Sequence, residues 1–138
     1  MSAAESARSI PGYTPPHAPP GVQAHLFRQR AFAGGEWIVA ANGATIAVED
    51  PATGRLLGSV PNLGREETSR AIHAAAAAQP LWAQRNVHER AEHLHRWARL
   101  MEECREDLAS LMTFEQGKPL AESRGEIDYA RSFLTWFA

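Results

Sequence analysis

The stretch TIAVEDPATGRLLGSVPNLG, residues 45–64, contains the point at which the hydrophobic pattern of this chain changes from strand to helix. Two apolar runs, 45–48 and 56–60, flank the turn DPATG at 50–54, which has proline at its second position and glycine at its exit. The runs are therefore predicted to be short antiparallel strands. No helical pattern separates them, which argues against the strand–helix–strand opening of a nucleotide-binding fold.

A further strand signal lies on the N-terminal side of this stretch. Phe32 and the run 37–39 flank a Gly-Gly pair at 34–35, and an Asn-Gly pair at 42–43 leads into the next strand. Such pairs are typical of tight turns between antiparallel strands. Together these strands are predicted to form one small antiparallel meander.

Apolar residues recur with a helical period beyond Gly64. An alanine-rich stretch predicts a helix over 65–79, and Pro80 is expected to start a new element. Asn86, followed three residues later by Glu89, has the spacing of a capping box and predicts the start of the second helix. The apolar face of that helix is predicted to consist of Val87, Ala91, Leu94, Ala98 and Met101.

Two more helices are expected after these. Gly117 is predicted to end the third in the left-handed conformation, and Pro119 to be the first residue of the fourth. The third helix carries Leu108, Leu111 and Met112, and the fourth presents Leu120, Ile127, Ala130, Leu134 and Phe137. The predicted fold class is α+β, with short antiparallel strands followed by about four helices.

Acidic side chains are frequent near the end of the chain, namely Glu115, Glu122, Glu126 and Asp128. Such a group could contain an acid–base pair. However, Asp128 lies four residues after Arg124 and three before Arg131, which are the spacings of ion pairs along one helix. Surface ion pairs within the last helix therefore explain these charges.

The two ends of the chain lead to different expectations. Five of the nine prolines lie within residues 1–20, so residues 1–24 are expected to form a disordered Pro/Ala-rich tail. The last turns carry Phe133, Leu134, Trp136 and Phe137 without a cap. We expect these side chains to pack against something outside the 138 residues, so that the chain is a fragment truncated at its C-terminal end. A short protein whose last helix closes on its own bundle is the alternative.

Composition limits the class of protein. The 138 residues carry 44% apolar side chains and a net charge of −2, which fits one soluble domain. No basic stripe favours nucleic acid or an anionic membrane as partner, and no apolar run approaches the roughly 20 residues needed to span a bilayer. The single cysteine, Cys104, cannot form an intrachain disulfide, which suits a reducing compartment and a cytoplasmic location.

Two sets of residues have metal-ligand or nucleophile chemistry. His88, Glu92 and His95 share one helix face and could hold zinc, but that face is opposite the apolar one and is better explained as solvated. Cys104 could be a nucleophile beside Arg105, yet it lies near a helix C-terminal end, whose dipole disfavours a thiolate. Cys104 is better explained as a structural or incidental cysteine, and no metal site is assigned.

The pair Gly117-Lys118 lacks the features of a phosphate-binding loop. No glycine stands five residues before Gly117, and proline follows the lysine. The chain also lacks a GxGxxG pattern. No cofactor-binding residue is therefore assigned.

Two longer strings carry a resemblance to a known family. They are EQGKPLAESRGEIDYARSFLTWFA, residues 115–138, and AGGEWIVAANGATIAVEDPATGRLLGSVPNLG, residues 33–64. Both resemble the aldehyde dehydrogenase superfamily, and YARSFLTWFA looks most like its succinate-semialdehyde branch. Trp82, Arg90 and Leu94 also fit. The similarity covers residues 25–138, with Asp50 in place of the more usual Asn and Phe114 in place of Leu.

The resemblance implies that residues 25–138 are the N-terminal part of the NAD(P)-binding domain of an α/β aldehyde dehydrogenase. The complete enzyme would oxidise succinate semialdehyde to succinate with NAD or NADP, through a cysteine thiolate and a glutamate that activates water. In the family these groups lie downstream, so Cys104 is not the nucleophile and no catalytic residue is assigned. The chain alone is expected to be inactive and to bind no cofactor.

The resemblance also implies partners: the remainder of the dehydrogenase chain, further copies in a homo-oligomer and a small aldehyde. It places the helix around Gly125 and Glu126 near the substrate entrance. Two other interpretations stay open at this point. One is a short non-catalytic protein that binds a dehydrogenase subunit or another partner through its apolar C-terminal helix. The other is a metal-binding helical module that uses His88, Glu92 and His95.

Overall fold

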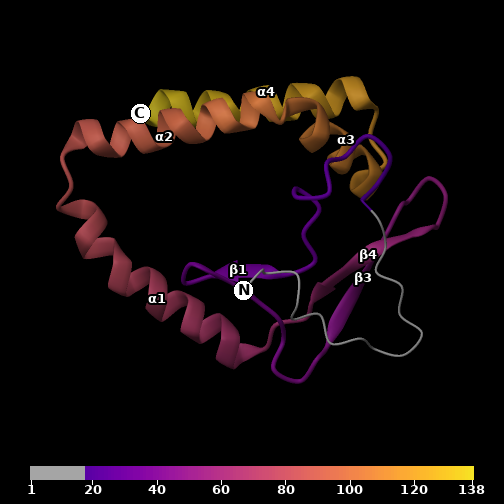
Figure 1. The fold of residues 1–138 in the computed structure, drawn as a ribbon, viewed down its shortest axis with the longest axis horizontal. Helices are drawn as coiled ribbons and strands as arrows, with labels where there is room; N and C mark the ends of the chain where they lie inside the picture. Colours follow the sequence, from indigo (N-terminus) through magenta and orange to yellow (C-terminus); the bar gives the residue numbers. More distant parts are fainter. Residues whose placement is uncertain (1–17) are drawn as a thin grey trace.

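The computed structural model describes residues 18–138 (Figure 1). Four strands come first: β1 (Ala31–Ala33), β2 (Glu36–Ile38), β3 (Thr45–Glu49) and β4 (Leu56–Pro61). Four helices follow: α1 (Arg65–Ala83), α2 (Val87–Glu103), α3 (Arg105–Gln116) and α4 (Leu120–Phe137). The predicted α+β order is confirmed. Within residues 18–138, no helix is both long and apolar enough to cross a membrane.

The strands form two separate hairpins, so the prediction of one continuous meander was wrong. β1 pairs with β2, with Phe32 opposite Trp37, and β3 pairs with β4, with Ile46 opposite Val60. The backbone between the hairpins forms a turn and not a strand pairing, because the Gly43 N–H donates to the Ala40 carbonyl. These residues are therefore not available to extend a ladder between β2 and β3.

α1 is tied to the strand region by one carboxylate that the sequence pattern did not single out. Glu67 is buried; its Oε2 accepts from the Gly64 N–H at 3.0 Å and its Oε1 from the Ala41 N–H at 2.9 Å. Glu67 thus satisfies a free donor at the start of the helix and also holds the turn after β2. The sequence signal for this contact is a glutamate three residues after Gly64, the residue that precedes the predicted helix.

Pro80 lies inside α1, so the expectation that it starts a new element was wrong. It falls within the last turn, and the helix continues to Ala83. The Gln84 N–H donates to the Pro80 carbonyl at 3.1 Å, so the helix closes past the proline. A proline so near the end removes only one helical hydrogen bond, on a stretch of α1 that is exposed to water.

Several predicted helix ends are confirmed. Asn86 caps α2 through Oδ1, which accepts from the His88 N–H at 2.8 Å. Gly117 ends α3 with φ +74°, the left-handed conformation. The predicted start of α4 differs by one position. Pro119 is the N-cap residue, and the helix itself begins at Leu120.

The helical core lies where α2, α3 and α4 meet, and Figure 1 shows α2 and α4 running side by side. Its buried residues are small: Ala98 of α2, Ala109 of α3 and Ser123 of α4, with Ile127 as the larger member. Small side chains let the helix backbones approach closely. In contrast, α1 leads away from the hairpins to the start of α2, and Glu67 is its one buried residue (Figure 1).

The expected tail lies only in part within the described residues, because 1–17 fall outside them. Val22 is buried, and Gln23 bonds to α3: its N–H donates to Asp107 Oδ1 at 2.8 Å and its Nε2 to Oδ2 at 3.1 Å. Contacts with the body therefore begin before the boundary predicted at residue 25.

Candidate functional site

The DPATG turn is held together by its own aspartate. Asp50 is buried; its Oδ1 accepts from the Ala52 N–H at 2.9 Å and its Oδ2 from the Thr53 hydroxyl at 2.7 Å. The bond from Thr53, and after it the bond from Ala52, holds the pKa of the Asp50 carboxyl below its usual value. Both oxygens of this aspartate are therefore engaged in shaping the turn.

The turn lies against the junction of α3 and α4. A Cβ placed on Gly117 would be 2.8 Å from Pro51 Cγ, so no side chain fits there. The two strings that carry the family resemblance thus meet in space at this contact. Lys118, the other member of the Gly-Lys pair, donates to Glu126 Oε1 at 2.7 Å. Gly117 thus ends a helix, and Lys118 forms an ion pair within the next helical region.

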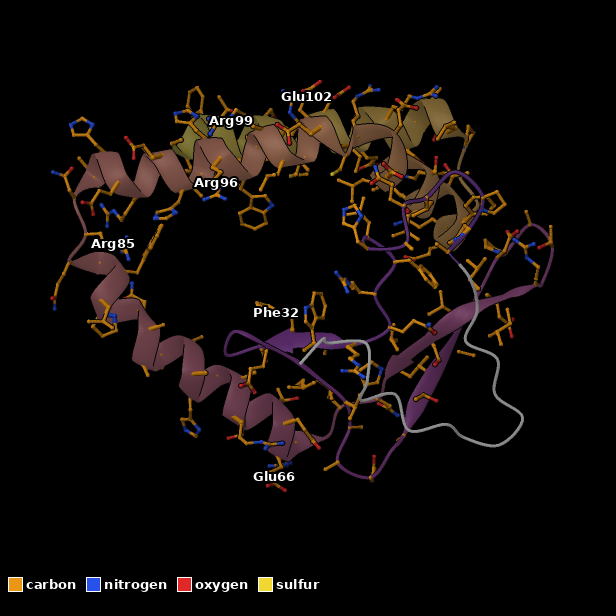
Figure 2. All side chains as sticks on the ribbon, in the orientation of Figure 1. Phe32, Glu66, Arg85, Arg96, Arg99 and Glu102 are labelled. Atoms are coloured by element: carbon orange, nitrogen blue, oxygen red, sulfur yellow. The ribbon has the colours of Figure 1, made fainter. Side chains whose placement is uncertain are left out.

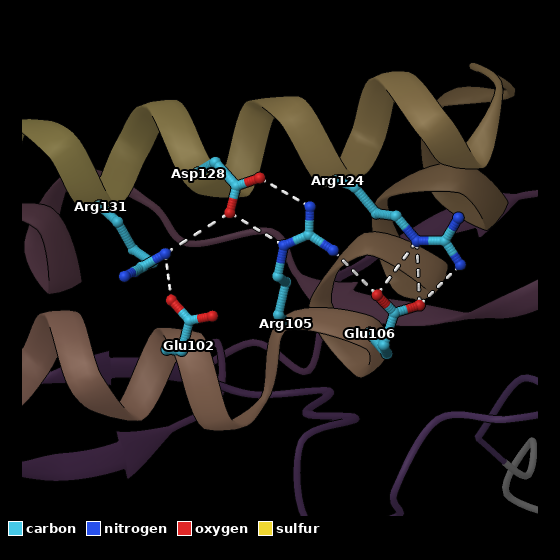
Figure 3. Close-up of polar contacts among 6 residues, drawn as sticks. All are labelled: Glu102, Arg105, Glu106, Arg124, Asp128 and Arg131. Atoms are coloured by element: carbon cyan, nitrogen blue, oxygen red, sulfur yellow. Dashed lines mark hydrogen bonds and ion pairs between the residues drawn. The ribbon is translucent and has the colours of Figure 1, made fainter.

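A chain of alternating charges links α2, α3 and α4 (Figure 3). Arg105 donates to both oxygens of Asp128, from Nε at 2.9 Å and from Nη2 at 2.6 Å, and its Nη1 donates to Glu106 at 3.0 Å. Arg124 donates hydrogen bonds to both oxygens of Glu106, at 2.7 to 3.0 Å. Fork-shaped pairs of this kind fix orientation as well as charge.

The chain of charges ends at Arg131, which pairs with Glu102 of α2 and lies 3.5 Å from Asp128. The predicted Asp128–Arg131 pair is therefore confirmed. The predicted Arg124–Asp128 pair was wrong, because both side chains find partners on α3 that satisfy two hydrogen bonds at once.

These charges are unsuited to acid–base catalysis. The Arg105 guanidinium lowers the pKa of Asp128, and the Arg124 guanidinium lowers that of Glu106. The same bonds raise the pKa of Arg105 above its usual value. A general acid or base works best with a pKa near the working pH, and each of these shifts points away from neutrality. The network is a clamp between helices.

The metal hypothesis is not supported by the arrangement of its residues. A groove of about 670 Å³ at the start of α2 includes Glu92 and His95 but not His88. The other lining residues are Arg85, Glu89, His93, Arg96 and Arg99, of which Figure 2 labels the three arginines. Over residues 18–138, no three His, Cys, Asp or Glu side chains are placed to hold one metal ion.

Cys104 occupies the junction of α2 and α3 and is half-buried. Its N–H donates to the Leu100 carbonyl at 3.1 Å, and its carbonyl accepts from the Leu108 N–H at 2.9 Å. The predicted position near the end of a helix is confirmed. Through its backbone, Cys104 closes one helix and opens the next.

α4 is apolar on two sides. Its inner side buries Ile127 against the other helices. Its outer face, as we define it, consists of the exposed residues Tyr129, Phe133, Trp136 and Phe137. The rings of Tyr129 and Phe133 meet edge to face at 4.8 Å. Apolar side chains on both sides are typical of a helix covered all round, and within residues 18–138 nothing covers this outer face.

Comparison with known proteins identifies the family. The model of the aldehyde dehydrogenase family matches residues 37–138. The chain belongs to the aldehyde dehydrogenase family, which confirms the resemblance found in the two strings.

Curated relatives and a solved structure refine this identification. The chain is 58% identical over 114 residues to glutarate-semialdehyde dehydrogenase of Pseudomonas aeruginosa. It is 55% identical over 114 residues to succinate-semialdehyde dehydrogenase [NADP(+)] of Escherichia coli. Each match covers 83% of this chain and 24% of the relative. The crystal structure of succinate-semialdehyde dehydrogenase from Burkholderia pseudomallei superposes with a TM-score of 0.81 at 51% identity, over 83% of this chain and 24% of that one.

The chain thus spans about a quarter of the length of these relatives, and it matches their N-terminal part. The described contacts fit that placement: the clamp, the Pro51–Gly117 contact and Glu67 each hold secondary-structure elements in position.

Proposed function

We propose that this chain is the N-terminal part of an NAD(P)-dependent semialdehyde dehydrogenase, which oxidises succinate semialdehyde to succinate when complete. The observation that carries this proposal is the 55–58% identity to relatives named for succinate and glutarate semialdehydes. The family match over residues 37–138 supports the same assignment.

The residues described here do not fit a dinucleotide. Such a cofactor is usually held by a glycine-rich turn that leads into a helix N-terminus, where free N–H groups face the pyrophosphate. The corresponding strand-to-helix turn before α1 has one glycine, Gly64, whose N–H already donates to Glu67. Glu66 and Glu67 make this first turn acidic. The cofactor site of the proposed enzyme is therefore assigned to residues outside this segment.

The catalytic groups are assigned outside this segment as well. Cys104 is engaged in a helix junction, and the acidic side chains of α3 and α4 that form the clamp have pKa values shifted below their usual range. The segment contributes a scaffold: two hairpins and a clamped helical layer on which the rest of the domain is built. The chain alone is proposed to be inactive, whereas the complete enzyme is proposed to act as a cytoplasmic homo-oligomer.

Glutarate semialdehyde is the second candidate substrate, because the Pseudomonas aeruginosa relative is named for it at 58% identity. The two substrates differ by one methylene, which an apolar pocket distinguishes by roughly 10- to 200-fold. The contacts that make this distinction are assigned to the downstream part of the enzyme.

The test uses the protein isolated from its source cells and the purified 138-residue chain side by side. Reduction of NAD or NADP is followed by absorbance with succinate semialdehyde, glutarate semialdehyde and an uncharged aldehyde of similar length. The proposal expects turnover of the first substrate by the native protein and none by the purified chain. Sustained turnover by the chain would show that the active site has been misplaced, and preference for the uncharged aldehyde would overturn the substrate assignment.

A further inference from the structure

We propose that one face of α2 is a contact surface for a second copy of this chain, in which the two α2 helices lie antiparallel across a two-fold axis. The surface consists of Glu89, Glu92, Arg96 and Arg99, which we name the charged stripe. The contact is independent of the proposed activity, because it joins copies of the chain and involves neither substrate nor cofactor.

The charged stripe is continuous along the helix. Its four members follow one another at spacings of three, four and three residues, so they share one face. All four are exposed, and all four line the groove of about 670 Å³ at the start of α2. Figure 2 labels Arg96 and Arg99 on this helix. Ala98, the buried residue of α2, lies on the other side, so the stripe faces away from the helical core.

The charges of the stripe have no ionic partners within the described part of the chain. Glu92 and Arg96 have the four-residue spacing of a helical ion pair. However, the only ion pair that reaches α2 within residues 18–138 joins Glu102 to Arg131. The stripe therefore offers two acidic and two basic groups to an external partner.

The order of these charges fits a second copy. Glu92 and Arg96 lie two residues before and after position 94, and Glu89 and Arg99 lie five residues before and after it. A two-fold axis at this point places Glu92 opposite Arg96 of the second copy, and Glu89 opposite Arg99 of the second copy. Each pair occurs twice, and no like charges face each other. A parallel pair of helices in register would instead place every charge opposite its own kind.

The proposed contact has a characteristic strength and salt dependence. Packed helices have axes about 8 to 10 Å apart, a separation that facing Glu and Arg side chains bridge. Leu100, which is 49% exposed, follows Arg96 by four residues and lies at the edge of the contact. Exposed ion pairs are individually weak and are screened by salt, so the association is reversible and salt-dependent. Apolar association through the outer face of α4 would not be weakened by salt.

Sedimentation velocity of the 138-residue chain at low and high salt measures this association. Arg96→Glu with Arg99→Glu makes the stripe wholly acidic, and Glu89→Arg with Glu92→Arg makes it wholly basic. We expect each variant alone to associate roughly tenfold more weakly than the parent, and an equimolar mixture of the two to associate as the parent does. Arg65→Glu, on an exposed position of α1, is the matched control and should change nothing. A parent chain without salt-sensitive association would overturn the proposal.

The variant with all four substitutions tests the antiparallel register. Its net charge equals that of the parent, and it should associate with itself as the parent does. It should not associate with the parent, because every pair across the two-fold axis would then join like charges. Energy transfer between differently labelled chains measures this choice. Mixed complexes of the parent and this variant would overturn the proposal, since attraction by net charge or a parallel contact allows them.

A disulfide test remains decisive if charge reversal disturbs α2. In a Cys104→Ser background, Glu92→Cys in one copy and Arg96→Cys in the other are expected to form a mixed disulfide on oxidation, because the axis places these positions opposite each other. Glu89→Cys mixed with Glu92→Cys is the mismatched pair, about 10 Å out of register along the helix. Equal yields of mixed disulfide from the two pairs would overturn the proposal. None of these measurements involves turnover, so their failure leaves the proposed activity unaffected.

Discussion

Gly117 lies so close to Pro51 that a Cβ on the glycine would be 2.8 Å from the proline Cγ. This contact joins the turn between β3 and β4 to the turn between α3 and α4. Gly117 also has φ +74°, where a side chain is strained even in open space. Two separate physical reasons thus require glycine at this position.

Gly117→Ala is expected to lower the free energy of unfolding by about 2 to 4 kcal/mol, because left-handed strain and the clash with Pro51 add together. Gly43→Ala is the matched control: Gly43 has φ +71°, but a Cβ there would meet no atom within 4 Å, so only strain applies, about 1 kcal/mol. Urea unfolding of both variants measures the difference. Equal losses would show that the Pro51 contact has no energetic weight.

The strand–turn–strand stretch at 45–60, the start of α1 and the stop at Gly117 were predictable because each depends on a few neighbouring residues. Turn chemistry, hydrophobic period and left-handed glycines are local properties. The aldehyde dehydrogenase resemblance was also recognisable, since it lies in two continuous strings.

Other features depended on residues that are far apart in sequence. Arg124 pairs with Glu106, 18 positions away, and Gln23 bonds Asp107 across 84 positions. Spacing rules favoured an ion-pair partner within α4. The partners on α3 are preferred because they form two parallel hydrogen bonds at once. The turn after β2 is likewise held by a hydrogen bond from the Ala41 N–H to Glu67, 26 positions away.

Acid pH should weaken the clamp through Asp128. The Arg105 guanidinium lowers the folded-state pKa of Asp128, so the stabilisation is present above the unfolded-state pKa, about 3.9, and is lost as the pH falls through the folded-state value. Asp128→Asn is therefore expected to unfold at lower urea concentration than the parent chain at pH 7. The gap should close under strongly acidic conditions. A gap that is independent of pH would show that packing, and not charge, causes the loss.

Glu115 should show the opposite dependence on pH. Although it is exposed by area, it lines a small hollow with Phe27, Val48 and Val60, and partial burial raises its pKa. The stability associated with its protonated form is present below the unfolded-state pKa, about 4.3, and is lost as the pH rises through the higher folded-state value. Glu115→Gln is thus expected to be more stable than the parent at pH 7.

Urea midpoints at pH 4 and pH 7 test this prediction. Glu103→Gln, on an exposed position of α2, removes the same charge without the hollow and serves as the control. A loss of stability in Glu115→Gln at pH 7 would contradict the assignment of a burial penalty.

Glu67→Ala should release the turn after β2 from α1. The substitution leaves the N–H groups of Ala41 and Gly64 without their acceptor. Amide hydrogen exchange is expected to quicken at both positions, with little change in the α2–α4 core. Glu66→Ala, in the same first turn but exposed, should leave both amides protected. Unchanged exchange at Ala41 in Glu67→Ala would mean that this hydrogen bond does not hold the turn.

If these residues form the first part of a semialdehyde dehydrogenase, the native protein should be about three and a half times as long as the 138-residue chain. An antibody against residues 25–138 can capture the native protein from its source cells, and mass spectrometry then gives its intact mass. We predict a species with about three and a half times the mass of the 15.1 kDa chain. A native species of 15.1 kDa would contradict the proposed assignment to a longer enzyme.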